Sequence, residues 1–175
     1  MDFGCGIGSA VPDFFDILGI VSLLGVDTSL KSVEVARHKF AGRATFEAIG
    51  RFQPKEQFDI AFCNGAFHHI PLRSRATAVA FVHRALRPGG LFAFWENNPW
   101  NPGTRYIMSR IPCDRDAVTL TTQEARQILQ AGGFEILRTD FLFVFPRVLK
   151  HFRWIEPKIC KFPLGAQYQI LCRKL

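Results

Sequence analysis

The segment Asp2-Phe3-Gly4-Cys5-Gly6-Ile7-Gly8 stands between a short apolar run, Met1–Phe3, and a predicted helix over Ser9–Leu18. Its glycines allow a tight turn and let backbone N–H groups approach a ligand without a Cβ atom in the way. The N-terminus of the following helix offers free N–H groups to an anionic group. The dinucleotide pattern Gly-x-Gly-x-x-Gly would place its third glycine at position 9, which is Ser9. The segment therefore predicts a ligand-binding turn of a different kind.

A second signal, Gly25-Val26-Asp27, closes a predicted strand over Ile20–Val26. Asp27 follows the glycine segment by roughly 20 residues, the spacing at which a carboxylate accepts hydrogen bonds from ribose hydroxyls. Asp27 could instead cap the helix that begins near Thr28 or Ser29 and runs to about Phe40. The combination with the glycine segment favours the ribose hypothesis.

Short apolar runs alternate with helical patterns along most of the chain. Further strands are predicted over Ala44–Ile49, Phe58–Cys63, Leu91–Trp95, Glu135–Phe145 and Gln167–Cys172, and further helices over Ser74–Leu86 and Thr121–Gln130. This alternation predicts an α/β fold with a Rossmann-like, doubly wound, mostly parallel sheet. The last two strands are joined without a clear long helix, so we expect an antiparallel pair and an antiparallel C-terminal strand at one edge.

Composition indicates one packed domain and excludes several classes of protein. The chain has 175 residues, of which 48% are hydrophobic and 18 are Phe. Its five cysteines are widely spaced and form no Cys-x-x-Cys pair, which argues against a disulfide framework or a structural zinc site. No signal-peptide pattern occurs, and no apolar run approaches the ~20 residues of a membrane span. We therefore expect a cytoplasmic protein.

The formal net charge of +7 favours an anionic partner, whether a nucleic acid, a phospholipid surface or an acidic metabolite. The basic residues form no continuous run, however, and are spread along the chain. This distribution is more typical of a solvated surface than of a nucleic-acid interface. A nucleic-acid partner is therefore not expected.

Three further motifs give the chain a family resemblance. The two signals above, followed by Phe58-Asp59-Ile60-Ala61-Phe62-Cys63, His68-His69-Ile70 and Leu86-Arg87-Pro88-Gly89-Gly90, resemble the motif series of the class I S-adenosylmethionine-dependent methyltransferases of the type 11/12 kind. The series runs in order from residue 2 to about residue 97. Ala131-Gly132-Gly133-Phe134 is similar to the family's Ala-Gly-Phe before its sixth strand. The segment from Glu96 to Pro102 is similar to a bacterial subgroup of small-molecule methyltransferases.

The resemblance implies S-adenosyl-L-methionine as cofactor and assigns residues to it. Asp27 would hold the ribose, and the residues after the fourth strand would pass beside the methyl-bearing sulfonium. Where the family often has an acidic residue for the adenine amino group, this chain has Ile49-Gly50-Arg51, so a backbone N–H would serve. The cofactor-binding candidates are Asp2, Gly4, Cys5, Gly6, Gly8, Asp27, Thr28, Gly50, Asn64 and Gly65.

The first strand of the family is longer than Met1–Phe3 and is preceded by helices. The resemblance therefore implies that residues 1–175 form a single methyltransferase domain whose first strand is largely missing. We expect the chain to be the C-terminal part of a longer natural domain.

Candidates for catalysis follow the fourth and fifth predicted strands. His68 or His69 could act as a general base, because histidine titrates near neutral pH. The alternative is that His69 packs against the cofactor loop. Glu96 is another candidate, and its alternative is a polar strand end that faces solvent. The spacing of Cys63, His68 and His69 fits no standard structural metal site, so no metal is expected.

These features predict methyl transfer from S-adenosylmethionine to a small-molecule or lipid- or glycan-linked acceptor. The segment 141–164 mixes aromatic and basic residues, so it could cover a lipid-like acceptor or touch an anionic membrane. The aromatic side chains could instead fill the core between the last strands. Two other functions stay open: an inactive truncated fragment or cofactor-binding subunit without catalysis, and a nucleic-acid methyltransferase.

Overall fold

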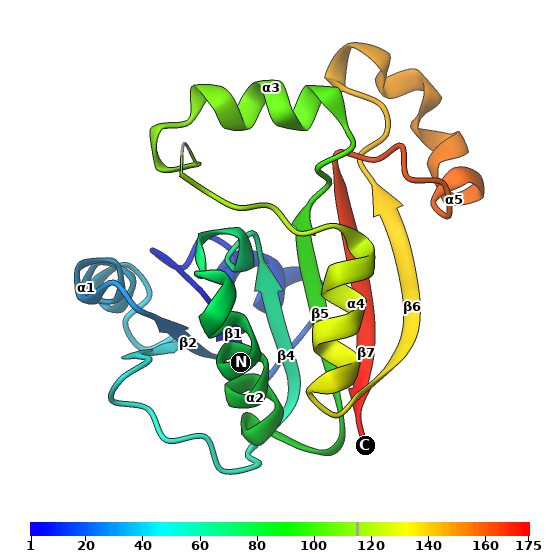
Figure 1. The fold of residues 1–175 in the computed structure, drawn as a ribbon. Coiled ribbons are helices and arrows are strands. Elements are labelled where there is room, and N and C mark those ends of the chain that lie inside the picture. Colours follow the sequence, from blue (N-terminus) through cyan, green and yellow to red (C-terminus); the bar gives the residue numbers. More distant parts are fainter. Residues whose placement is uncertain (115) are drawn as a thin grey trace.

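The computed structural model describes residues 1–114 and 116–175, and its centre is a seven-stranded sheet (Figure 1). The strands lie in the order β3-β2-β1-β4-β5-β7-β6. Their bounds are Asp2–Phe3 for β1, Leu24–Asp27 for β2, Thr45–Ala48 for β3, Phe58–Asn64 for β4, Leu86–Asn97 for β5, Phe134–Leu142 for β6 and Gln167–Lys174 for β7. The strands from β3 to β5 pair in parallel, and β7 runs antiparallel to both β5 and β6. The predicted α/β sheet with an antiparallel pair at one edge is confirmed, with β7 one place inside β6.

Helices flank the sheet and connect its strands. Those that follow the strands are η1 Asp13–Ile17, α1 Leu30–Lys39, η2 Phe67–His69, α2 Leu72–Ala85, α3 Pro102–Arg110, η3 Pro112–Asp114, α4 Thr122–Ala131, η4 Arg147–Ile155 and α5 Glu156–Ile159. The side chain of Ser29 accepts a hydrogen bond from the backbone N–H of Ser32, so Ser29 rather than Thr28 caps α1. None of the helices in the described ranges has the length and apolar character that crossing a bilayer requires.

Two apolar clusters hold these elements together. The larger one packs residues of α2 and α4 against the sheet, and aromatic pairs such as Phe67 and Phe94, whose ring centroids are 4.9 Å apart, fill it. The smaller cluster joins η1 and α1 to β3 through residues such as Val11, Phe14 and Phe46. Burial of this many large side chains supplies the main driving force for folding.

Strand β1 is short but central. Asp2 pairs with Gly25 of β2 on one side and with Phe62 of β4 on the other, and Phe3 pairs with Val26. These two residues therefore bring the carboxyl ends of β1, β2 and β4 to the same edge of the sheet. In open α/β sheets, ligands bind at this edge.

Several element bounds differ from those expected, for local reasons. Strand β5 begins at Leu86 rather than Leu91 because Leu86 already pairs with Phe58, and an irregularity accommodates the Pro-Gly-Gly turn before Leu91 pairs with Ile60. Strand β6 ends at Leu142 because Phe143 has a φ of 61°, a left-handed backbone that an extended strand does not contain.

Helix α3 was not expected, because its first residues belong to a segment rich in Pro and Asn. Asn101 caps it, and its side-chain oxygen accepts a hydrogen bond from the backbone N–H of Thr104 at 3.0 Å. Pro102 occupies the first turn, where its missing N–H costs nothing. The Thr104 hydroxyl donates to the carbonyl of Ala166 at 2.7 Å, which ties α3 to the segment before β7.

Candidate functional site

A cavity of about 950 Å³ lies at the carboxyl ends of β1, β2 and β4. Its walls come from the glycine loop after β1, the turns after β2, β3 and β4, and one face of α2. Its residues are Phe3, Gly4, Gly6, Asp27, Thr28, Ser29, Ser32, Ile49, Gly65, Ala66, His69, Ile70, Pro71, Ser74, Thr77, Ala78, Phe81 and Cys113. The volume is at the upper end of the range typical of small-molecule and cofactor sites.

The glycine loop forms the floor of this cavity. The N–H of Gly4 donates to the carbonyl of Val26 at 2.8 Å, which fixes the loop on β2. Gly4 and Gly6 have φ values of 77° and 52°, which only glycine adopts without strain. A Cβ atom on Gly4 would lie 2.6 Å from the Cβ of Ala66, whereas a Cβ on Gly6 would meet no protein atom within 4 Å. The loop therefore leaves room beside Gly6 for a ligand.

Asp27 organises this loop from the end of β2. Its Oδ2 accepts a hydrogen bond from the N–H of Gly6 at 2.8 Å, and its Oδ1 accepts one from the N–H of Ser29 at 2.8 Å. Both oxygens keep further lone pairs, and the side chain lines the cavity. Asp27 thus does not cap α1, whose cap is Ser29, and its position in the cavity agrees with the ligand-binding hypothesis.

The ten predicted cofactor residues divide into two groups. Gly4, Gly6, Asp27, Thr28 and Gly65 line the cavity, whereas Asp2, Cys5, Gly8, Gly50 and Asn64 are absent from its described lining. Asp2 is buried in the sheet, and Cys5 packs in the smaller apolar cluster. A Cβ on Gly8 would lie 2.8 Å from the ring of Phe40, so this glycine permits close packing. Asn64 accepts a hydrogen bond from the Gln167 amide at 3.3 Å.

Residues of α2 form a cavity wall that the sequence interpretation did not include. Ser74, Thr77, Ala78 and Phe81 line the cavity together. Their spacing of three and four residues places them on one helix face. That spacing, on a helix that follows the fourth strand, is the signal that could have identified them.

His68 and Glu96 form a buried pair next to the cavity. Glu96 is fully buried, and its Oε2 lies 2.7 Å from Nδ1 of His68. Its Oε1 accepts hydrogen bonds from the N–H groups of Phe67 at 2.7 Å and His68 at 3.3 Å, so it also holds the start of η2. The alternative in which Glu96 faces solvent is therefore wrong. Glu96 orients His68 rather than reaching the cavity.

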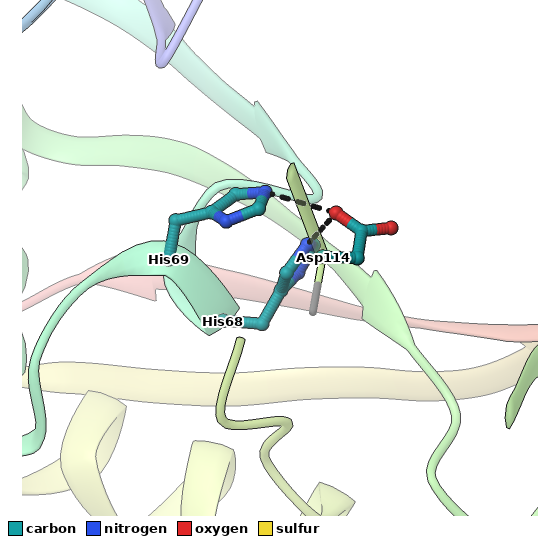
Figure 2. Close-up of side chains that lie close together, drawn as sticks. All are labelled: His68, His69 and Asp114. Atoms are coloured by element: carbon teal, nitrogen blue, oxygen red, sulfur yellow. Dashed lines mark ion pairs between the residues drawn. The ribbon is translucent and has the colours of Figure 1, made fainter. Parts of the chain in front are cut away.

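Asp114 joins the two histidines, as Figure 2 shows. Its Oδ1 lies 3.6 Å from Nε2 of His68 and 3.3 Å from Nε2 of His69. Burial lowers the pKa of His68, but the hydrogen bond to Glu96 and the charges of Glu96 and Asp114 outweigh burial, so the pKa lies above its ordinary value. Sequence spacing could not have identified Asp114, because η3 and η2 meet only in the folded chain.

A second, smaller cavity of about 170 Å³ lies beside Asp114. Its described lining consists of Asn97, Thr104, Ile107, Met108, Ile111, Asp114, Ala166 and Gln167. Because His69 lines the large cavity and Asp114 lines the small one, the two side chains stand at the junction between them. Cys63 is fully buried, and its thiol is not among the ligand atoms that gather with those of His68, His69 and Asp114.

Known proteins of similar sequence match about half of the chain. A trans-aconitate 2-methyltransferase of Rhizobium leguminosarum bv. trifolii is 31% identical over 94 residues, or 53% of this chain and 36% of that protein. A second trans-aconitate 2-methyltransferase, from Rhizobium etli, is 33% identical over 72 residues, or 41% of this chain and 28% of that protein. The matched segment thus spans about a third of these relatives.

Solved structures show the same fold over nearly the whole chain. An S-adenosylmethionine-dependent methyltransferase from Mesorhizobium loti superposes with a TM-score of 0.70 at 22% identity, covering 99% of this chain and 89% of that chain. A methyltransferase from Archaeoglobus fulgidus gives a TM-score of 0.75 at 16% identity, covering 99% and 84%. The family description "Methyltransferase domain" matches residues 1–94, more than half of the chain. The chain belongs to this methyltransferase domain family.

Proposed function

We propose that this protein transfers a methyl group from S-adenosylmethionine to a small-molecule acceptor. The observation that carries the proposal is the large cavity in which Asp27 holds the open glycine loop at the carboxyl ends of β1 and β2. The loop leaves open space beside Gly6, and Asp27 offers oxygen lone pairs for two hydroxyl groups. These groups fit an aminoacyl-nucleoside cofactor, which supplies an already activated methyl group when bound.

The protein's own residues then position the acceptor and exclude water. The small cavity beside Asp114 offers the side-chain amides of Asn97 and Gln167 as polar contacts, on otherwise largely apolar walls. Its volume of about 170 Å³ suits a small acceptor group. In this proposal, His69 contacts the acceptor from the large cavity, whereas Glu96 and His68 hold the arrangement from the core.

We take a carboxylic acid as the first acceptor to test, because both curated relatives are named for methylation of a tricarboxylic acid. A carboxylate oxygen attacks the methyl group without a general base, whereas a hydroxyl acceptor would need His69 to take its proton. The polar side chains of His69 and Asp114 lie at the junction between the two cavities, where a polar acceptor could contact them.

The test is a transfer assay with methyl-labelled S-adenosylmethionine and a panel of di- and tricarboxylic acids, with hydroxylated analogues in parallel. We expect label in a methyl ester of one acid, and at least tenfold less product from Asp27→Asn. The variant Asp59→Asn, at an exposed carboxylate outside the described cavity lining, is the matched control. A folded chain that transfers label to none of these small molecules would contradict the proposal.

A lipid-linked acceptor is a second candidate, favoured by the surface of η4. Phe152 and Trp154 are 50% and 68% exposed, so the interpretation that these aromatic side chains fill the core is wrong, although Phe141 is buried. Arg147, Lys150 and Arg153 lie on the same helical segment. Helix α3 and this segment lie at the same end of the molecule (Figure 1). Exposed aromatic residues among basic ones are typical of contact with an anionic lipid surface.

Vesicle sedimentation tests this candidate. We expect the chain to pellet with vesicles containing phosphatidylglycerol and to stay in solution with phosphatidylcholine alone. Replacing Phe152 and Trp154 by Ser should reduce the bound fraction at least fivefold, because lipid-inserted aromatic area is lost. Val21→Ser, at a residue that is 97% exposed elsewhere, is the control. Equal binding by the double variant would exclude this surface as the contact.

A further inference from the structure

His68, His69 and Asp114 converge on one point from two separate segments of the chain. Figure 2 shows both imidazole rings directed at the same carboxylate oxygen of Asp114. The distances from that oxygen to Nε2 of His68 and His69 are 3.6 Å and 3.3 Å. Both exceed the 2.7–3.2 Å range of ordinary N–H···O hydrogen bonds. One ligand atom from each of the three residues lies within 4.8 Å of the others.

These separations match those between ligands of a tetrahedral metal ion. Bonds of about 2.1 Å from zinc to nitrogen and oxygen place neighbouring ligand atoms about 3.4 Å apart. The distances of 3.3 Å and 3.6 Å bracket this value. Two imidazoles and one carboxylate are also a ligand set that zinc uses when a fourth position stays open for water or substrate.

Glu96 supplies an independent observation. Its Oε2 lies 2.7 Å from Nδ1 of His68, and its other oxygen is held by backbone N–H groups. This pairing places the Nδ1 proton toward Glu96 and leaves Nε2 free as a lone-pair donor that faces Asp114. A buried carboxylate on the far nitrogen is the arrangement that usually orients a metal-binding histidine. Glu96 would thus be a positioning residue, without contact to the ion.

We propose that His68, His69 and Asp114 bind a divalent transition-metal ion of the zinc type at the junction of the two cavities. Among the described lining residues of either cavity there is no lysine or arginine. The role of the ion rests on the proposed function: it would supply the positive charge that binds and orients an acidic oxygen of the acceptor. The spacing of Cys63, His68 and His69 predicts no metal site, because it contains no sign of Asp114, which reaches the histidines only in the folded chain.

Metal titration of the full chain tests this site without any activity measurement. The purified protein is stripped with a chelator, and Co²⁺ is added while visible absorption is followed, since tetrahedral Co²⁺ absorbs strongly. Zn²⁺ is then added to displace it, with calorimetry for the affinity. His69→Gln and Asp114→Asn each remove one ligand at the surface of the cluster. His38→Gln, an exposed histidine on α1, is the matched control.

We expect one Co²⁺ per chain, displaced by one Zn²⁺, with unchanged behaviour in His38→Gln. Both ligand variants should bind at least tenfold more weakly, while their circular dichroism and thermal unfolding without metal match the wild type. Glu96→Gln should weaken binding less than loss of a ligand. Absence of a tetrahedral spectrum, or equal affinity in all variants, would overturn the site. Binding of metal by a chain that binds no S-adenosylhomocysteine would leave this site standing and reject the proposed function.

Discussion

At the scale of single residues, two carboxylates shape the site by accepting backbone hydrogen bonds. Asp27 fixes the glycine loop through Gly6, and Glu96 fixes the start of η2 through Phe67. Hydrogen bonds to a charged acceptor contribute about 1.5–3 kcal/mol each. Asp27 therefore fixes the backbone of the glycine loop. Glu96 fixes the start of η2 and orients the imidazole of His68.

Asp2 gives a prediction for the pH dependence of stability. Burial raises the pKa of Asp2 to about 7; the amino terminus acts against this shift and the charge of Asp27 adds to it. The folded state thus holds the proton more tightly than the unfolded chain, whose carboxyl has its ordinary value of 3.8. The contribution to stability is fully present below about pH 4 and is lost as the pH rises to about 7.

The measurement is the difference in free energy of unfolding between Asp2→Asn and the wild type from urea titrations at several pH values. Between about pH 4 and pH 7, this difference should move in favour of the variant by about 1.4 kcal/mol per pH unit. Asp59→Asn, at an exposed carboxylate, is the matched control. A difference that does not change with pH would refute the raised pKa of Asp2.

Residues that act through local chemistry were predictable, and those that depend on long-range contacts were not. Gly4, Gly6 and Asp27 were predicted as cofactor residues, and they line the cavity because a turn and a strand end impose their places. Asp114 was missed because only packing of η3 beside η2 brings it to His69. Likewise, Gly8 packs against the ring of Phe40 and Cys5 packs against Gly25 of β2, and neither contact is visible in the local sequence.

At the scale of elements, helix α4 shows how closely local sequence can specify a helix. The predicted start at Thr121 coincides with its cap, and Glu124 completes a capping box. The N–H of Thr121 donates to Glu124 Oε2 at 2.7 Å, and the N–H of Glu124 donates to the Thr121 hydroxyl at 3.2 Å. Both bonds satisfy N–H groups that the helix itself leaves unpaired.

Removing the cap should therefore destabilise the fold measurably. We expect Thr121→Ala to lower the free energy of unfolding by about 1 kcal/mol, because the N–H of Glu124 loses its partner. Thr121→Ser keeps the hydroxyl and should lose less than half of that. Urea unfolding followed by circular dichroism measures both variants. If the Ser variant were as destabilised as the Ala variant, the hydroxyl would not be the source of the stability.

Helix α3 shows where prediction from local sequence failed. The segment from Asn97 to Pro102 reads as a loop because Pro and Asn interrupt regular patterns. Yet Asn101 and Pro102 are the residues that begin a helix, and Thr104 anchors it to Ala166. The helix depends on this tertiary anchor, which its own sequence does not reveal.

At the scale of the whole molecule, the order of the sheet brings the site together. The crossing from β3 back to β4 places β1 between β2 and β4, so that three strand ends open into one cavity. The alternation of strands and helices was enough to predict this architecture. The depth of the cavity and its junction with the smaller one were not predictable, because they arise from α2, α3 and η3 packing over the same edge.

The distribution of charge over the molecule agrees with a small acceptor. Many basic side chains form ion pairs with acidic ones, including Arg37 with Glu47, Arg87 with Asp59 and Arg173 with Glu135. These pairs belong to different elements along the chain. A net charge of +7 thus need not form the continuous basic surface that binds a nucleic-acid backbone.

The most direct test of the account is calorimetric titration of the chain with S-adenosylhomocysteine, alongside Asp27→Asn. The account predicts saturable binding of one ligand per chain, weakened at least tenfold in the variant, because Asp27 both holds Gly6 and faces the cavity. Circular dichroism must show that both proteins are folded. A folded wild-type chain that binds none of the ligand, or a variant that binds it equally well, would contradict the claim that this cavity holds the methyl donor.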